Sequence, residues 1–562
     1  MNILGLNYIF HDTSACVVRD GELVVAVEEE RLTRRKHTQS FPHESIKSCF
    51  RHAKLSYAQI DHIAVSVQPE KSFTEKLSYA ARLNGRASSF IEYEFDRPEA
   101  RHLAFWSWFH AHWPSEQRAP QVHFIEHHVA HAAGSYYVSP WRKAALLSMD
   151  GWGEWTTTWL GYAVESDVVR VNESFFPHSL GLFYSAATEF CGFKPNYDEG
   201  KTMGLAPTGD ASRFYREVNS MVSVSRSGEV HIDLSWFDFD VPGRALCGEK
   251  FYSRFGAARK GKEPIEQRHK DIAAAFQRVL EDKAIDLCGV LEQSTDAEHL
   301  VVAGGVALNS VMNGRLLRET RFRDIYVMPG AGDNGTCIGA AYALFNGRLQ
   351  QSKRYHHNNP YLGAEYSSEE ITRTLDECKI TYQHCEDICR DTAALLRAGK
   401  IIGWFQGRME FGARSLGNRS ILADPSIPGM KDRINLEVKH RESFRPFAPS
   451  VPAESCEAYF DIHVDSPFML KVCAVRESKR ASMAAIVHVD GSARVQTVER
   501  TVNRRYYELL TQFGEVSGHP VLLNTSFNVM DEPIVESPLD AIRCFFSTGL
   551  DYLAIGDYLI GK

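Results

Sequence analysis

Apolar and polar positions alternate over short distances in the first 30 residues of the chain. Residues 3–8, 14–19 and 22–27 are apolar runs of strand length, bounded by turn residues. Asp20-Gly21, between the second and third runs, is typical of a two-residue hairpin turn. The pattern therefore predicts three consecutive strands joined by tight turns.

A second group of strands and turns begins near residue 144. The apolar run 144–149 leads into Asp150-Gly151-Trp152-Gly153, and threonines follow this turn. It repeats the strand, turn and strand pattern of the first group. Two such groups in one chain predict two related lobes that face each other across a cleft.

Helical periodicity separates these strand-rich regions. Residues 271–293 have apolar side chains at a three-four spacing, which predicts an amphipathic helix. A strand at 300–303 follows, and strands that alternate with helices predict an α/β fold. Residues 70–118 form a predicted helical insertion, and its aromatic-rich end favours local core packing over a lid above a ligand.

The polar stretch 347–359 is predicted to be an interdomain linker. It divides the chain into domains 1–346 and 360–562, as expected for a chain too long for one hydrophobic core. The glycine-punctuated, charged segment 197–207 is interpreted as a loop that lines the cleft.

Composition narrows the class of protein. The chain has 562 residues and a formal net charge of −8, which argues against a large nucleic-acid interface. Its N-terminus lacks a secretory pattern and no apolar run is long enough to cross a membrane, so a cytoplasmic protein without membrane contact is expected.

Two histidines supply the first candidate for chemistry. His127 and His131 are four residues apart at the predicted start of a helix, so their imidazoles lie on one face. Imidazole is a common ligand of divalent metals, and Asp150 and Asp333, both in glycine-containing turns, are the carboxylates that would complete a site. The alternative is a helix whose histidines are satisfied within the core or by solvent.

Small and basic residues indicate places where anions would bind. Gly304-Gly305 follows a strand, and the glycine-rich turn 329–335 comes soon after, so backbone amides would approach a phosphate or an adenosine closely. The turn that holds His11 and Asp12 has the polar character of a phosphate loop in actin-like ATPases and sugar kinases. The basic residues 34–36 are either a solvated face or nucleotide ligands.

The C-terminal domain has a different character. Its arginines and one lysine lie among glycines, prolines and aromatic residues, in the segments 407–419, 439–449 and 488–496. Such positions are poor candidates for a solvated face, and the rigid guanidinium group suits convergent binding of anions.

Together, these motifs resemble the O-carbamoyltransferases of antibiotic and nodulation-factor biosynthesis. The resemblance extends over nearly the whole chain, in order and spacing. It is carried by His11-Asp12, EHHVAHA (126–132), DGWGEW (150–155), KTMGLAP (201–207), AGGVALN (303–309), PGAGDNG (329–335), EFGARSLGNRS (410–420), FRPFAPS (444–450) and NTSFN (524–528). It implies an N-terminal Kae1-like domain with the actin-like ATPase (ASKHA) fold, two-lobed, and a C-terminal YrdC-like α/β domain.

The resemblance also implies a two-step reaction. In the C-terminal domain, carbamoyl phosphate and Mg-ATP would give carbamoyl adenylate and pyrophosphate. In the N-terminal domain, which would hold iron(II), the carbamoyl group would pass to a hydroxyl of a small-molecule acceptor and AMP would leave. A homodimer is expected by the same resemblance.

Carried over residue by residue, the resemblance assigns four sets of side chains. The metal ligands would be His127, His131, Asp150 and Asp333. Gly304, Gly305 and Asn309 would bind the adenylate, joined by Lys36 from the basic run. Carbamoyl phosphate and ATP would bind Arg414, Lys439, Arg445, Arg494, Asn524 and Ser526, of which Lys439 and Arg445 are the expected catalytic residues. His11 or Asp12 would orient or deprotonate the acceptor hydroxyl.

Two other functions stay open at this point. One is a tRNA-modifying enzyme that uses a threonylcarbamoyl adenylate, although the net negative charge and the fusion of both domains count against it. The other is a non-catalytic actin-like module that binds a nucleotide. The ligand types do not separate iron from zinc or manganese, and the acceptor could be an antibiotic scaffold, a toxin or a lipo-oligosaccharide.

Overall fold

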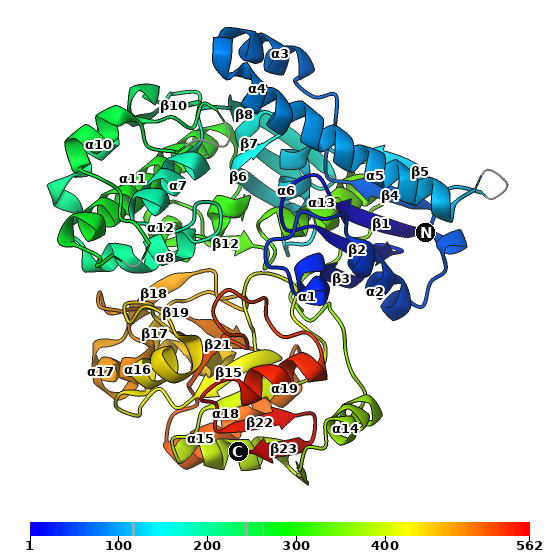
Figure 1. Ribbon diagram of the computed structural model, residues 1–562, viewed down its shortest axis with the longest axis vertical. Helices are drawn as coiled ribbons and strands as arrows, with labels where there is room; N and C mark the ends of the chain where they lie inside the picture. The colour runs from blue at the N-terminus through cyan, green and yellow to red at the C-terminus, as the bar shows by residue number, and fades with distance from the viewer. Residues whose placement is uncertain (115–117, 242–244, 262) are drawn as a thin grey trace. The chain divides into compact units, whose positions relative to one another are not determined.

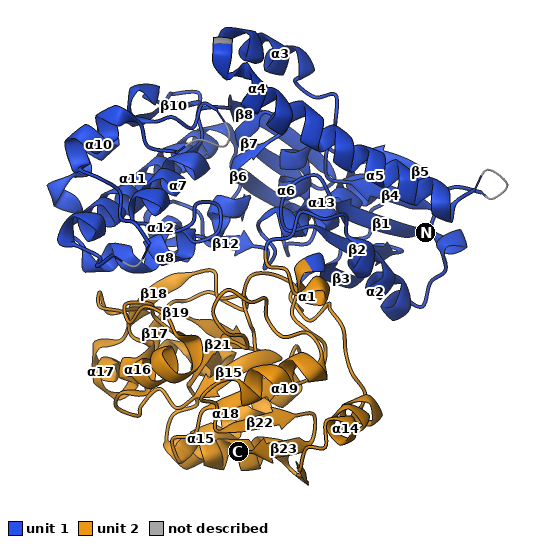
Figure 2. Ribbon diagram, viewed as in Figure 1, with its two compact units in different colours: residues 1–29, 37–357 blue, residues 30–36, 358–562 orange. Residues whose placement is uncertain are grey.

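The protein is a mixed α/β structure with two compact units. The computed structural model describes residues 1–114, 118–241, 245–261 and 263–562. Unit 1 comprises residues 1–29 and 37–357, and unit 2 comprises residues 30–36 and 358–562 (Figure 2). The short segment 30–36 therefore belongs to unit 2 although unit 1 surrounds it in the sequence.

Unit 1 contains two five-stranded sheets with the same topology (Figure 1). In each sheet, three successive antiparallel strands are extended by two parallel strands. The first has the order β3-β2-β1-β4-β5 and the second β12-β11-β6-β7-β8. The strands are β1 (Asn2–Asn7), β2 (Ser14–Arg19), β3 (Glu22–Glu28), β4 (His62–Val65), β5 (Gln121–Phe124), β6 (Lys143–Gly153), β7 (Thr156–Val164), β8 (Asp167–Phe175), β11 (His299–Ala303) and β12 (Asp324–Val327). The predicted pair of related lobes is confirmed at the level of topology.

The first hairpin agrees with its sequence pattern. β2 and β3 pair antiparallel and are joined at Asp20 and Gly21, which have φ angles of 49° and 82°. Left-handed conformations at both positions match the right-handed twist of the strands, which is why Asp-Gly is favoured there.

Helices cover the sheets of unit 1. They are α2 (His43–Ala53), α6 (His127–Tyr136), α7 (Leu180–Phe190), α8 (Glu199–Leu205), α9 (Tyr215–Ser220), α10 (Glu249–Phe255), α11 (Gln267–Ser294), α12 (Ser310–Glu319) and α13 (Thr336–Tyr342). α11 confirms the predicted amphipathic helix. The interpretation of residues 197–207 as a loop was wrong, because most of this segment is helix α8; its glycines did not prevent a short helix from packing against α7 and α11. A two-stranded sheet of β9 (Val222–Val224) and β10 (Val230–Ile232) completes the unit.

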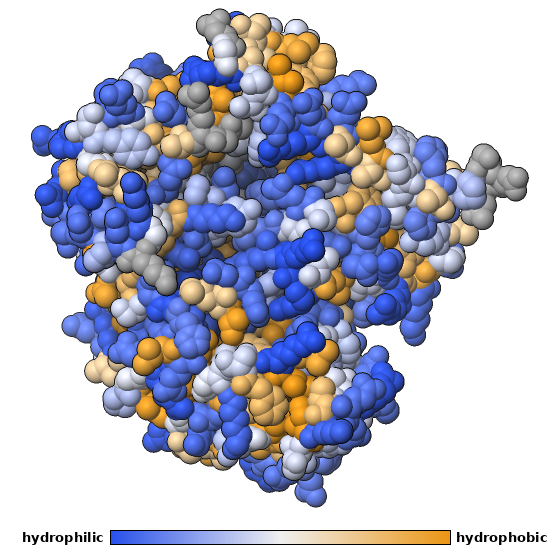
Figure 3. Space-filling model, viewed as in Figure 1, coloured by the Kyte–Doolittle hydropathy of each residue, from blue (hydrophilic) through white to orange (hydrophobic). Residues whose placement is uncertain are grey.

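The insertion between β4 and β5 is helical. It consists of α3 (Phe73–Arg82), α4 (Ala87–Ile91), the π-helical turn η3 (Glu92–Asp96) and α5 (Arg97–His112). Phe105, Trp108 and Phe109 are buried, so local packing of the aromatic segment is confirmed. The outer side of α3 is apolar at Phe73 and Leu77 (Figure 3). Residues 115–117 of the predicted insertion lie outside the described residues.

Unit 2 is built on an eight-stranded mixed sheet, in the order β13-β23-β22-β14-β15-β21-β16-β20, with a separate sheet β17-β18-β19. Its strands are β13 (Gln383–His384), β14 (Ile402–Phe405), β15 (Arg419–Ala423), β16 (Ala448–Pro452), β17 (Phe460–Asp461), β18 (Val472–Val475), β19 (Ser492–Arg494), β20 (Gln496–Val498), β21 (Leu522–Ser526), β22 (Tyr552–Ile555) and β23 (Tyr558–Gly561). Its helices are α14 (Ser368–Glu377), α15 (Ile388–Arg397), α16 (Met430–Ile434), α17 (Glu477–Arg480), α18 (Arg504–Ser517) and α19 (Pro538–Phe546), while α1 (Glu29–Thr33) crosses the boundary between the units. α15 and α18 pack on Trp404 of β14 in a hydrophobic core of the unit.

The polar stretch that precedes unit 2 is held on unit 1 as far as His357. The Arg354 guanidinium donates hydrogen bonds to backbone carbonyls of Tyr136, Tyr137 and Trp141, and the Tyr326 hydroxyl donates to the carbonyl of His357.

Among the described residues, no helix is long and apolar enough to span a membrane.

Candidate metal centre and anion site

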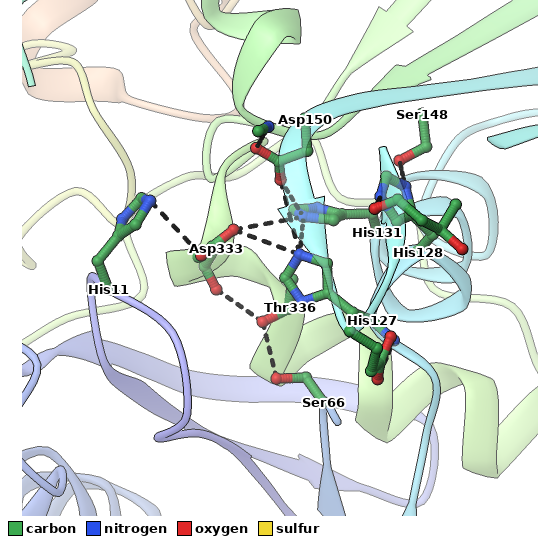
Figure 4. A network of polar contacts seen from close by, with 12 residues as sticks. His11, Ser66, His127, His128, His131, Ser148, Asp150, Asp333 and Thr336 are labelled. Carbon is green, nitrogen blue, oxygen red and sulfur yellow. Dashed lines mark hydrogen bonds and ion pairs between the residues drawn. The ribbon is translucent and has the colours of Figure 1, made fainter. Parts of the chain in front are cut away.

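Four side chains converge inside unit 1. The Nε2 atoms of His127 and His131 are 3.0 Å apart, and Nε2 of His131 lies 2.9 Å from Oδ2 of Asp150. Oδ1 of Asp333 lies 3.5 Å from each of the two Nε2 atoms (Figure 4). All four ligand atoms lie within 4.8 Å of one another and all four residues are buried. The structure thus brings together the four residues that spacing and resemblance had selected.

Small residues let the elements that carry these ligands approach closely. α6 supplies both histidines and packs against α13, which follows Asp333 in the chain. A Cβ added at Gly339 would lie 1.8 Å from the Ala130 carbonyl oxygen, and one at Gly134 would lie 2.8 Å from Cα of Gly339. Backbone contact of this kind is possible only where side chains are absent, so these glycines determine how near the histidines come to Asp333.

Asp150 reaches the centre because β6 departs from regular pairing near its end. The register with β7 shifts between Met149 and Gly153, which frees Asp150 from the ladder. One carboxylate oxygen of Asp150 accepts a hydrogen bond of 2.7 Å from the Gly151 amide. The other oxygen is directed toward the histidines.

A second layer of residues holds α6 in place, and sequence reasoning missed it. The Glu154 carboxylate accepts hydrogen bonds from the backbone amides of His127 and Gln68, at 3.1 and 2.8 Å. It therefore satisfies the free N-terminus of α6, where a negative charge is favoured. The position of Glu154, an acidic residue directly after the DGWG turn, was the only indication of this contact in the sequence. Its partner, His127, lies 27 positions earlier in the chain.

His128 has a structural role despite its position between the two ligands. Its Nε2 donates to the carbonyl of Thr156 at 3.0 Å, and its Nδ1 accepts from the Ser148 hydroxyl at 2.9 Å. Burial and the neighbouring imidazoles keep the pKa of His128 well below its usual range. It is a neutral imidazole whose two nitrogens are both occupied.

The charges of the cluster suit a divalent cation. Burial alone disfavours protonation of His131, but hydrogen bonds to Asp150 and Asp333 raise the pKa of its imidazole to about 9. Burial likewise opposes ionisation of Asp150, but hydrogen bonds from His127 and His131 hold its pKa well below the usual range. Two buried carboxylates facing two imidazoles need a shared positive charge, and two nitrogens with two oxygens are a suitable ligand set for Fe²⁺, Zn²⁺ or Mn²⁺.

Gly153→Ala is expected to weaken metal binding by about 10- to 100-fold, as loss of support for a ligand does. A Cβ at Gly153 would lie 2.0 Å from Cδ2 of His127, so the imidazole must move. Metal content after dialysis against a graded chelator measures the effect. Gly151→Ala is the matched control, because a Cβ there meets nothing within 4 Å; equal metal loss in both variants would contradict the prediction.

A chain of polar contacts leads from the metal centre to the turn between β1 and β2. His11 Nε2 lies 3.6 Å from Oδ2 of Asp333, and His11 Nδ1 donates to Asp12 at 2.9 Å. The other Asp12 oxygen accepts from His37 at 2.8 Å. Nearby carboxylates overcome burial and raise the pKa of His11 well above its usual range.

Asn7 anchors this turn. Its side-chain amide donates to the backbone carbonyls of His11, Asp12 and Asp333, at 3.1, 3.3 and 3.0 Å. One buried amide thus joins the first turn to the loop that carries Asp333.

The glycine turn after β11 packs directly against Asp150. Gly304 has a φ of 84°, and a Cβ there would lie 2.1 Å from the carbonyl oxygen of Met149; a Cβ at Gly305 would lie 3.0 Å from Oδ1 of Asp150. Asn309 caps α12 by accepting from the Met312 amide, and it exchanges hydrogen bonds with Gln277. The turn is close to the metal centre, while the Asn309 side chain is occupied within the protein.

Unit 2 contains a second group of functional candidates, which we call the cation cluster: Arg414, Lys439, Arg441, Arg445 and Arg494. Lys439 is only 3% exposed. Its ammonium donates to neutral oxygens alone, including the Asn528 amide oxygen at 2.8 Å and the Ser526 hydroxyl at 3.2 Å.

The members of the cation cluster repel one another. Burial, then the neighbouring guanidinium groups, lowers the pKa of Arg414 to about 10 and that of Arg441 to about 9. The same causes hold the pKa values of Lys439 and Arg494 well below their usual ranges. Nε of Arg414 and Nε of Arg494 are buried without a hydrogen-bond partner.

Carboxylate partners are lacking for four members of this group within the described part of the chain. Within residues 1–114, 118–241, 245–261 and 263–562, no carboxylate forms an ion pair with Arg414, Lys439, Arg441 or Arg494. Buried and half-buried cations without carboxylate partners are characteristic of a site for a polyanion. Arg441 was not selected from the sequence, although it lies in the same basic segment as Lys439.

The remaining predicted ligands have different surroundings. Ser526 contacts Lys439, whereas Asn524 is buried in β21 and its amide donates to the Ser450 hydroxyl and the Gln496 side chain at 3.1 Å each. Lys36 is exposed in the segment 30–36 of unit 2, and its charge contributes to the lowered pKa of Lys439.

Comparison with known proteins gives matches along the chain. The family model described as "Carbamoyltransferase N-terminus" matches residues 2–342, and "Carbamoyltransferase C-terminus" matches residues 393–562. The chain is 39% identical to the uncharacterized protein sll1178 of Synechocystis sp., covering 100% of this chain and 97% of that protein. It is 36% identical to nodulation protein NolNO of Sinorhizobium fredii, with coverage of 99% and 80%. A 3'-hydroxymethylcephem-O-carbamoyltransferase of Amycolatopsis lactamdurans is 33% identical over 47% of this chain and 49% of its own.

Proposed function

The chain belongs to the carbamoyltransferase family, and from this premise we propose that it is an ATP-dependent O-carbamoyltransferase that works in two steps. Carbamoyl phosphate and ATP would react in unit 2, and the carbamoyl group would be transferred in unit 1 to a hydroxyl of a small molecule. The observation that carries this proposal is the presence of two unlike sites, a buried His/Asp cluster and a cluster of buried and half-buried cations.

The proposal extends to the fold and its boundaries. The shared topology of the two sheets in unit 1 supports a Kae1-like, two-lobed domain of the actin-like ATPase class over residues 1–346. For residues 360–562 we propose a YrdC-like domain, on the strength of its mixed sheet and cation cluster.

The first step must conserve phosphorus. Carbamoyl phosphate is cleaved with one water to carbamate and inorganic phosphate, and a carbamate oxygen then attacks the α-phosphorus of ATP. The bond from this phosphorus to the β-phosphate bridge breaks, and pyrophosphate leaves. Both substrates are polyanions, so fixed cations in a site of low dielectric stabilise the charge that develops on the leaving phosphates.

The cation cluster provides these charges. Lys439 is held by neutral oxygens of Ser526 and Asn528, so its position is fixed while its positive charge stays uncompensated and favours a nearby anion. Arg414 and Arg494 each have a buried Nε without a partner, and an anionic oxygen would satisfy both. Arg445 would complete the site as a further phosphate ligand.

The second step would take place beside the metal centre. His127, His131, Asp150 and Asp333 would hold the ion, with iron(II) as the first candidate and zinc or manganese as alternatives. When bound, the ion supplies Lewis-acid polarisation of the carbamoyl carbonyl.

His11 is the proposed base for the acceptor hydroxyl. The carboxylates of Asp333 and Asp12 raise the pKa of His11, so the ring would act as a base only when a cation held by Asp333 offsets that charge. Its Nδ1–H is directed to Asp12, and its Nε2 would then accept the hydroxyl proton as the oxygen attacks the carbamoyl carbon. Asp12, held in turn by His37, fixes the orientation of the ring. The C–O bond to AMP breaks as the new C–O bond to the acceptor forms, so AMP leaves and the carbamate ester remains. The glycine turn at Gly304 and Gly305 is the proposed contact for the adenylate.

A hydroxyl acceptor is supported by the name of the cephem O-carbamoyltransferase among the relatives. A homodimer stays a prediction.

The experiment that tests the function is nucleotide product analysis with ATP, with and without carbamoyl phosphate. We expect pyrophosphate and inorganic phosphate, together with carbamoyl adenylate or the AMP formed by its hydrolysis, only when carbamoyl phosphate is present. Formation of ADP as the sole nucleotide product would contradict the proposal.

A further inference from the structure

The helical insertion presents one line of side chains that the proposed reaction has not used. Tyr93, Arg97 and Arg101 follow each other at intervals of four residues, from η3 into α5, and therefore lie on one face. Tyr93 is 36% exposed. The Arg97 guanidinium lies over its ring at 5.3 Å and is paired with Glu92.

One end of this face meets the turn that carries a metal ligand. The rings of Tyr93 and Trp152 are 5.5 Å apart between centroids, and Trp152 is two residues after Asp150. Gly151 lies between Asp150 and Trp152 in the sequence, and a Cβ there would meet nothing within 4 Å, so the turn beside Asp150 has open space at this position. Burial, then the charge of Glu94, raises the pKa of Tyr93.

The other end of the face meets the loop that supports His11. The Arg101 guanidinium donates to the side chain of Gln39, two residues after His37. His37 binds Asp12, which holds His11. The face thus extends from the turn of Asp150 to the loop behind the proposed base, beside the place where a hydroxyl must react.

A buried ion pair fixes the aromatic end of this surface. The Trp152 indole N–H donates to Glu94 at 2.9 Å, and Glu94 pairs with Lys76 at 3.0 Å; both charged residues are buried within the insertion. Burial of two charges is costly unless they are paired and hydrogen-bonded, so this arrangement holds the indole in one orientation. Glu94 is therefore a positioning residue for Trp152.

The charge of the face restricts what it can bind. Arg101 is half-buried, and burial lowers the pKa of its guanidinium. Among the described residues no carboxylate forms an ion pair with it. A half-buried cation without a carboxylate partner favours a neutral or acidic ligand and disfavours a polycation, while the partly exposed rings of Tyr93 and Trp152 favour the apolar face of a ring.

We propose that Tyr93, Trp152 and Arg101 form the acceptor-binding surface, and that the acceptor is a ring-bearing hydroxyl compound that is neutral or anionic. The inference rests on the proposed function, because it assigns the acceptor of that reaction. It excludes polycationic sugars as preferred acceptors and assigns specificity to the insertion.

The test uses the full chain and three nitrophenyl glycosides as probes: a glucoside, a glucuronide and a glucosaminide, which are neutral, anionic and cationic at pH 6. Binding is measured by ligand-observed NMR titration without ATP or carbamoyl phosphate. We expect the glucosaminide to bind about tenfold more weakly than the other two. Tyr93→Ala should weaken binding of all three about tenfold, and Arg101→Gln should remove only the discrimination against the glucosaminide.

Leu103→Ala is the matched control, because Leu103 is 60% exposed on α5 and lies off this face. Absence of probe binding, preference for the glucosaminide, or equal affinities of Tyr93→Ala and Leu103→Ala would overturn the inference. Pyrophosphate release by the wild-type chain with carbamoyl phosphate is measured separately. If it occurs while the probes fail, the inference alone is wrong; if it does not occur, the proposed function is wrong whatever the probes do.

Discussion

Lys439→Ala is expected to lower carbamoyl phosphate-dependent release of pyrophosphate by about a thousandfold. The Lys439 ammonium is buried and its position is set by Ser526 and Asn528, without a carboxylate to neutralise it. Removing it takes away a charge that is already in place for the phosphates, and water cannot replace it without cost in a buried site. Steady-state release of pyrophosphate, followed by a coupled assay, measures the loss.

Lys400→Ala is the control for this variant. The Lys400 side chain is 42% exposed and is 3.8 Å from Asp551, so its loss should leave the rate within about twofold of wild type, as exposed pairs contribute little. Because the mutual repulsion within the cation cluster falls when one charge is removed, Lys439→Ala is also expected to keep its fold. A Lys439→Ala chain that is folded and fully active would rule out the cluster as the adenylation site.

His131→Ala is expected to abolish carbamoyl transfer while the first step continues. His131 contacts Asp150 at 2.9 Å and His127 at 3.0 Å, so its loss removes one of four ligands and leaves two carboxylates close together. Loss of Lewis-acid stabilisation worth several kcal/mol corresponds to a rate of carbamoyl transfer that is lower by at least about a thousandfold. Metal content by mass spectrometry and formation of carbamate ester are the two readouts.

His231→Ala controls for removal of an imidazole as such, since His231 is 56% exposed at β10. It should retain full metal content and transfer activity. If His131→Ala bound metal as tightly as the control, the His/Asp cluster would not be the metal centre.

The sequence predicted the elements that carry the ligands because their signals are local. The four-residue spacing of His127 and His131 is a property of one helix, and the strand before Asp150 is a single apolar run. In the same way, three strands and one hairpin turn could be predicted from 27 residues.

The supporting contacts could not be predicted because they join distant parts of the chain. Glu154 and Asn7 act through backbone groups of other segments, which carry no side-chain signal. Asn309 has a structural role that the sequence did not indicate, since it caps α12 and pairs with Gln277; its binding of the adenylate stays a prediction. The helix α8 was missed because glycine and proline in 197–207 outweighed the local periodicity.

The central claim is that adenylate synthesis depends on the cation cluster of unit 2 and not on the metal centre of unit 1. Carbamoyl phosphate-dependent exchange of labelled pyrophosphate into ATP, without acceptor, tests it most directly, because only a reversible adenylation gives this exchange. We expect exchange in the wild-type and His131→Ala chains and none in Lys439→Ala. Exchange that is lost in His131→Ala and retained in Lys439→Ala would contradict the claim.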